Sequence, residues 1–168
     1  MSLYPSMTQS LPFNTPVESG LRSLIILTEA FPASYDLQRL LFFDYLLVHS
    51  ADAPDGPESL HPGTPHRSGE VLVRRGVVED GLAFLVNRGL IEKRFDRSGI
   101  IYAATEYAVP FLDCLKADYT QRLKERAKWV VGTFGGYTDE RLARFFNSNL
   151  DRWGSEFLHE SLFRELPQ

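Results

Sequence analysis

The segment from Leu37 to Val48 constrains the fold more than any other part of this chain. Its apolar residues leave little polar surface on any side of a helix, so this helix is predicted to run through the centre of a core. Asp44 is the exception, and a buried carboxylate needs a cationic partner because an unpaired buried charge costs several kcal/mol. Arg39 and Arg67 are the candidate partners.

Helical patterns lie on both sides of this segment. Thr15-Pro16-Val17-Glu18 forms a capping box that begins a helix, and Pro32 ends it, because proline cannot continue the hydrogen-bond ladder. After the central segment, we predict a short helix over 68–75 and a second helix over 77–89, with a break at Gly76. Gly89 is a natural helix stop.

Two runs of strand-forming residues follow, over 90–95 and 100–105, on either side of the tetrapeptide Asp96-Arg97-Ser98-Gly99. Their spacing predicts an antiparallel hairpin. Helices followed by a hairpin are the order of a winged helix. We therefore expect a mainly α fold with a small β-hairpin: a winged-helix core over residues 15–115 and a C-terminal helical extension over 116–168 packed on it. Residues 1–14 are expected to be a flexible segment.

Size and composition favour one domain. The chain has 168 residues, of which 43% are hydrophobic, and its net charge of −4 weighs against a protein whose main affinity is for nucleic acid. The start lacks the pattern of a secretion signal, and no apolar run reaches the roughly eighteen residues of a membrane span, so a cytoplasmic location is expected. Cys114 lies in an apolar run and is predicted to be a buried structural thiol.

Catalytic motifs are not found in the sequence. It contains no phosphate-binding loop, dinucleotide-binding glycine pattern or nucleophile elbow, so neither an enzyme nor a cofactor site is expected. Four side chains around one loop could converge on a metal, but their spacing fits no metal motif, and we predict none: His49, Asp52, His61 and His66.

The stretch over 50–66 is a long loop with four prolines and two glycines between Ser50 and Pro65. Loops of this length are uncommon unless they carry function or are mobile. We predict that the loop and the basic residues near the hairpin form a surface for partner proteins: His49, His61, His66, Arg67, Arg74, Arg75, Lys93, Arg94 and Arg97. The alternative is that His49 and His66 only tie the loop to the core.

The charges on the helix before the hairpin indicate whether the protein binds DNA. In a DNA-binding winged helix this helix enters the major groove. Here its charges are Glu79, Asp80 and Arg88, and two carboxylates would be repelled by the phosphates that line the groove. The sequence therefore favours a protein partner, although the basic residues of the hairpin could contact DNA.

Several runs of unusual composition resemble, in order, the middle component of bacterial ABC-three-component systems. They are Phe13 to Arg22, Asp36 to Leu40, Phe43 to Ser50, and Leu60 to Glu70. The resemblance implies a small subunit that works with an ATPase of the SMC/Rad50 type and an effector, in defence systems against phage or plasmids related to the Lamassu group. It supplies no catalytic residue.

Two functions agree with these features of the sequence. The first is a non-catalytic adaptor that bridges the ATPase and the effector. The alternative is a winged-helix transcriptional regulator that binds DNA as a homodimer, with aromatic side chains that would suit a dimer interface or equally an ordinary core: Phe145, Phe146, Trp153 and Phe157.

Overall fold

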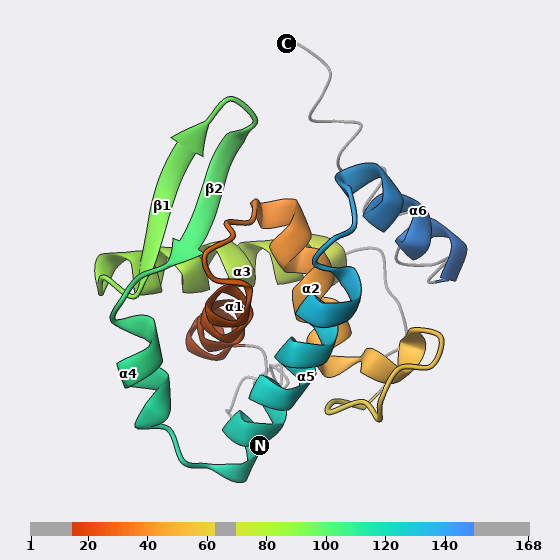
Figure 1. Ribbon diagram of the computed structural model, residues 1–168, viewed down its shortest axis with the longest axis horizontal. Coiled ribbons are helices and arrows are strands. Elements are labelled where there is room, and N and C mark those ends of the chain that lie inside the picture. The colour runs from red at the N-terminus through yellow and green to blue at the C-terminus, as the bar shows by residue number, and fades with distance from the viewer. Residues whose placement is uncertain (1–14, 63–69, 150–168) are drawn as a thin grey trace, which may run out of the picture.

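The computed structural model describes residues 15–62 and 70–149 (Figure 1). This part of the chain is mainly helical with one antiparallel hairpin, which confirms the predicted fold class at that level. Its elements are α1 (Pro16–Ala30), α2 (Leu37–Val48), the short 3-10 helix η1 (Ser50–Asp52), α3 (Glu70–Asn87), β1 (Ile91–Asp96), β2 (Gly99–Ala104), α4 (Ala108–Asp113), α5 (Asp118–Phe134) and α6 (Asp139–Asn149).

Helix α2 forms the centre of the core, as its composition predicts. Every residue from Arg39 to Val48 is buried, and α1, α3 and α5 pack against it. Helix α6 closes one end, where the rings of Phe42 and Phe146 lie 4.1 Å apart between centroids. Phe146 is fully buried there, so it is a core residue; Trp153 and Phe157 lie outside the described residues.

Helix α1 begins at the predicted cap, where the Thr15 side chain accepts a hydrogen bond from the Glu18 amide at 3.3 Å. It then crosses α3 at two glycines. A Cβ atom on Gly20 would lie 2.7 Å from the Gly81 carbonyl oxygen, and one on Gly81 would lie 2.4 Å from the carbonyl oxygen of Pro16. The two backbones are therefore in direct contact, and neither glycine can carry a side chain without moving a helix.

The predicted break at Gly76 is wrong, because α3 runs unbroken through it. Gly76 faces open space, with no atom within 4 Å of the position that its Cβ would take. An exposed glycine inside a helix costs about 1 kcal/mol relative to alanine, which is too little to end a helix that the core holds on its other side. Gly89, with a positive φ of 73°, follows the end of α3 as predicted.

The hairpin pairs Ile91 with Ala104 and Asp96 with Gly99. Its turn is closed by the Asp96 carboxylate, which accepts hydrogen bonds from the amides of Ser98 and Gly99 at 2.7 and 3.2 Å. On the other side of β2, Tyr35 and Tyr102 exchange two backbone hydrogen bonds of 2.9 and 2.8 Å. The hairpin is thus anchored to the connection between α1 and α2.

Cys114 is exposed, so the prediction of a buried thiol is wrong. It follows α4, whose buried side is formed by Ala108 and Leu112, and the Cys114 thiol points away from that side and donates to the Pro110 carbonyl at 3.3 Å. None of the helices that the structure describes is long and apolar enough to cross a membrane.

Candidate functional site

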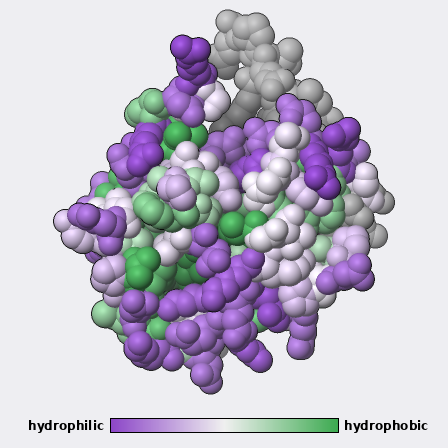
Figure 2. Space-filling model, viewed as in Figure 1, coloured by the Kyte–Doolittle hydropathy of each residue, from purple (hydrophilic) through white to green (hydrophobic). Residues whose placement is uncertain are grey.

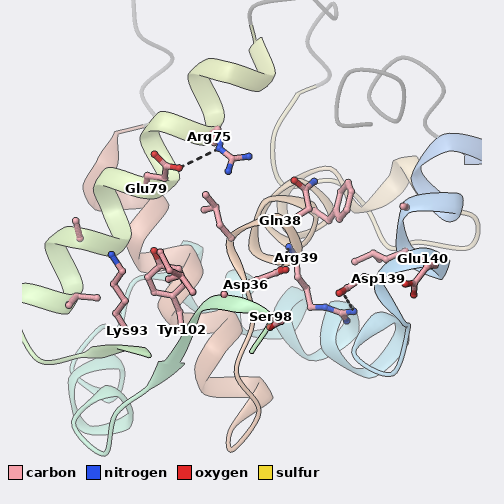
Figure 3. Close-up of a pocket in the computed structure, with 18 of the residues that line it drawn as sticks. Asp36, Gln38, Arg39, Arg75, Glu79, Lys93, Ser98, Tyr102, Asp139 and Glu140 are labelled. Carbon is pink, nitrogen blue, oxygen red and sulfur yellow. Dashed lines mark hydrogen bonds and ion pairs between the residues drawn. The ribbon is translucent and has the colours of Figure 1, made fainter. Parts of the chain in front are cut away.

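A groove of about 1090 Å³ lies between the hairpin, α3, the start of α2 and α6 (Figure 3). Its lining combines apolar side chains from all four elements with charged ones at the rim. The charged lining residues are Asp36, Arg39, Arg75, Glu79, Lys93, Asp139 and Glu140. On the face shown in Figure 2, apolar patches lie among polar ones over the hairpin and in the middle of the face, while the lower edge is largely polar.

The arginines of the groove are held down by their own neighbours. Arg39 donates to the Asp139 carboxylate at 2.9 Å and to the Tyr137 carbonyl at 2.6 Å. Arg75 lies 3.4 Å from the carboxylate of Glu79, one helical turn away. The side chains of Arg39 and Arg75 are 10% and 9% exposed, whereas those of Asp139 and Glu79 are 75% and 47% exposed. On the side formed by α3 and α6, the groove therefore exposes its carboxylates to solvent, while its guanidinium groups are buried.

The carboxylate of Asp44 forms a buried triad with Arg22 and Arg74. Arg22 Nε lies 2.6 Å from Oδ1, and Arg74 Nη1 lies 2.7 Å from Oδ2. Burial alone would raise the pKa of Asp44, but the charges and hydrogen bonds of the two guanidinium groups hold this pKa below its ordinary value. The triad joins α1, α2 and α3 at the point where they meet.

The prediction that Arg39 neutralises Asp44 is wrong, and Arg67 lies outside the described residues. Arg39 precedes Asp44 by more than one turn of α2 and so projects from another side of the helix, toward α6. The sequence carried a signal for Arg22 that was missed. Arg22 is followed at helical spacing by Ile25 and Ile26, so it lies on the apolar side of the helix, where a buried guanidinium calls for an anionic partner.

The described part of the loop after α2, up to residue 62, is held against the core by hydrogen bonds. The amides of Leu60 and His61 both donate to the Val48 carbonyl at 3.0 Å, and the Arg126 guanidinium donates twice to the Glu58 carbonyl, at 3.0 and 2.8 Å. His61 Nε2 lies 2.6 Å from the Tyr119 hydroxyl, which links the loop to α5.

The structure describes seven of the nine residues predicted to contact partners, and these seven fall into a buried group and an exposed group. Four are buried at no more than 8% exposure: His49, His61, Arg74 and Arg75. These four side chains pack inside the fold and form no exposed surface. For His49, this agrees with the alternative that it ties the loop to the core. Lys93, Arg94 and Arg97 are exposed on the hairpin; His66 and Arg67 lie outside the described residues. Within the described residues, no three potential ligands gather as a metal site would require.

The stability of the fold is expected to fall below pH 6.5 because of His61. Burial, the charge of Arg22 and the neighbouring His49 lower the pKa of His61 from 6.5 to about 4. The unfolded chain therefore takes up this proton first, so the contribution is complete above pH 6.5 and is lost as the pH falls toward 4, by at most ~1.4 kcal/mol per pH unit.

Urea denaturation at pH 7, 6 and 5 measures this effect. The His61→Phe variant should lose the part of the pH dependence that His61 causes. The control is Tyr119→Phe, which removes the hydroxyl beside His61 but keeps the imidazole, and it should retain the slope. Equal slopes for wild type and His61→Phe would contradict the assignment.

Comparison with protein families gives a match over residues 12–156 to the family described as ABC-three component (ABC-3C) system Middle Component 2. The match spans all the elements described above. No curated protein and no solved structure matches the chain.

Proposed function

Because the chain belongs to the Middle Component 2 family of ABC-three component systems, we propose that it is a non-catalytic adaptor subunit in a bacterial defence complex. A middle component belongs to a system of several components, which implies partner subunits. We propose that these partners are an SMC/Rad50-type ATPase and an effector, that the adaptor bridges them in the cytoplasm, and that the complex acts against phage or plasmids in the manner of Lamassu-related systems.

We further propose that α1 to β2 form a winged helix. The order of the elements supports this interpretation, because α1, α2 and α3 precede the hairpin. Tyr35, between α1 and α2, pairs with β2 at the place where a winged helix has its short first strand. On this reading α3 corresponds to the helix that would read DNA, and the hairpin is the wing.

The groove is the observation that carries the adaptor proposal. It lies on the side of α3 that faces the hairpin, where a DNA-binding winged helix would meet its target. Here α6 stands across from α3, and the exposed carboxylates of Glu79 and Asp139 line the space between them. These carboxylates would repel phosphates on the α3 and α6 side of the groove, whereas basic side chains of a protein segment would be attracted there.

The alternative, a homodimeric DNA-binding regulator, is favoured by one feature, the exposed cations of the hairpin. Lys93 and Arg97 extend from it into solvent, and Arg94 is half exposed beside Glu92 at 2.8 Å. A regulator would bind its own promoter with steep salt dependence and a clear preference over random DNA.

Purification of the tagged chain, expressed together with its native genomic neighbours, tests the adaptor proposal. We expect an ATPase and an effector to co-elute in a fixed ratio at moderate salt, as identified by mass and stoichiometry. A chain that elutes alone as a dimer and binds its upstream DNA selectively would contradict the adaptor and favour the regulator.

A further inference from the structure

We infer that the groove binds one amphipathic segment of a partner subunit, with apolar side chains against the hairpin and lysine or arginine side chains against α3 and α6. This inference rests on the proposed adaptor function and specifies where the partner binds.

The hairpin gives the groove an apolar wall that continues outward. The strand register places Phe95 opposite Ile100 and Lys93 opposite Tyr102, so all four side chains stand on one face of the hairpin. Lys93, Ile100 and Tyr102 line the groove, which fixes that face as the inner one. Phe95 and Ile100 are nevertheless 76% and 42% exposed. They form an apolar pair at the mouth of the groove that a ligand can cover.

The opposite rim gives the groove its charge preference. Arg39 and Arg75 are buried beneath the carboxylates that they pair with, and Asp139 and Glu79 extend into solvent. Glu140 adds an exposed carboxylate next to Asp139 on the first turn of α6. A segment that enters the groove therefore meets negative charge on this side, and basic side chains complement it.

The size of the groove fits a peptide segment. Small-molecule pockets usually measure about 300–1000 Å³ and enclose their ligand. This groove, at about 1090 Å³, lies just above that range and continues onto the exposed Phe95 and Ile100. An apolar floor with charged edges is the pattern that recognises a helix or strand with one apolar face.

Site-specific photo-crosslinking in the co-expressed complex locates the segment. A benzoylphenylalanine at position 100, at the mouth of the groove, should crosslink to the ATPase or effector subunit. The crosslinked peptide should carry apolar residues next to lysine or arginine. Position 109 on α4 is the control, because Val109 is similarly exposed, at 52%, on another element. Crosslinks from position 109 alone would overturn the inference.

Affinity measurements with the purified partner subunits test the residues. Phe95→Ser should weaken binding roughly 30-fold, as expected for an aromatic hot spot, and Glu140→Gln should weaken it several-fold. The matched controls are Phe111→Ser on α4 and Glu125→Gln on α5, two exposed residues outside the groove, and neither should change binding. Thermal melts of each variant verify that it is folded.

The results separate the two proposals. If the wild-type chain binds neither subunit, the adaptor function fails and the inference fails with it. If the wild type binds and the groove variants bind equally well, only the groove inference is overturned. If Phe95→Ser weakens binding to random duplex DNA but not to the subunits, the hairpin is a nucleic-acid contact and the inference is also overturned.

Discussion

Replacing Asp44 with alanine is expected to lower the free energy of unfolding by about 3–5 kcal/mol, which is a large part of the stability of a domain of this size. The substitution leaves the guanidinium groups of Arg22 and Arg74 in the core without the carboxylate that neutralises them. Two buried positive charges then lie close together. Urea denaturation at pH 7, followed by circular dichroism, measures the loss.

The chain offers a matched control in Asp139. Its carboxylate also pairs with an arginine, at 2.9 Å from Arg39, but its side chain is 75% exposed. The Asp139 carboxylate faces solvent, and Arg39 keeps its hydrogen bond to the Tyr137 carbonyl when that carboxylate is removed, so Asp139→Ala should cost only about 1 kcal/mol. Similar losses for the two variants would show that the triad does not have the energetic role assigned to it.

Replacing Gly81 with alanine is expected to cost about 3 kcal/mol, although alanine is the better helix former. The added methyl group would lie 2.4 Å from the Pro16 carbonyl oxygen and 2.6 Å from the Gly20 amide nitrogen. Both contacts are with backbone atoms, which cannot move aside as a side chain does, so α1 and α3 must separate.

Gly76 is the control for Gly81 because it lies on the same helix and faces open space. Gly76→Ala should raise the free energy of unfolding by about 0.5–1 kcal/mol through helix propensity alone. Thermal or urea denaturation should therefore show that the free energy of unfolding falls for Gly81→Ala and rises for Gly76→Ala. A stabilising effect at both positions would mean that α1 and α3 do not cross at their glycines.

The sequence predicted those parts of the fold that depend on neighbouring residues. The central helix followed from the apolar run between Leu37 and Val48, the first helix from its capping box, and the hairpin from the turn residues Asp96 to Gly99. Each of these signals acts over a few residues, so it can be read without knowing what packs against the segment.

The parts that were missed depend on pairs far apart in the chain. Asp44 was correctly expected to need a cation, but its partners Arg22 and Arg74 lie 22 and 30 residues away, on other helices. Gly76 and Gly81 look alike in sequence, since only the approach of α1 distinguishes them. Cys114 lies in an apolar run, yet it falls on the outer side of a short helix.

The candidate site was predicted least well. The hairpin cations are exposed, and their contact with partners stays a prediction, whereas His49, His61, Arg74 and Arg75 are interior residues. The groove was not foreseen, because its walls come from four elements that are joined only by the tertiary fold.

The backbone bridge between Tyr35 and Tyr102 connects the hairpin to the start of the central helix. Tyr35 immediately precedes Asp36, whose carboxylate caps α2 by accepting from the Arg39 amide at 2.9 Å. Arg39 in turn holds the turn before α6 through the Tyr137 carbonyl. The hairpin, the first turn of α2 and the turn before α6 are therefore joined by one continuous series of hydrogen bonds. The same hydrogen bonds thus set the position of both walls of the groove, so the spacing between the hairpin and α6 is a property of the folded core and does not depend on either element alone.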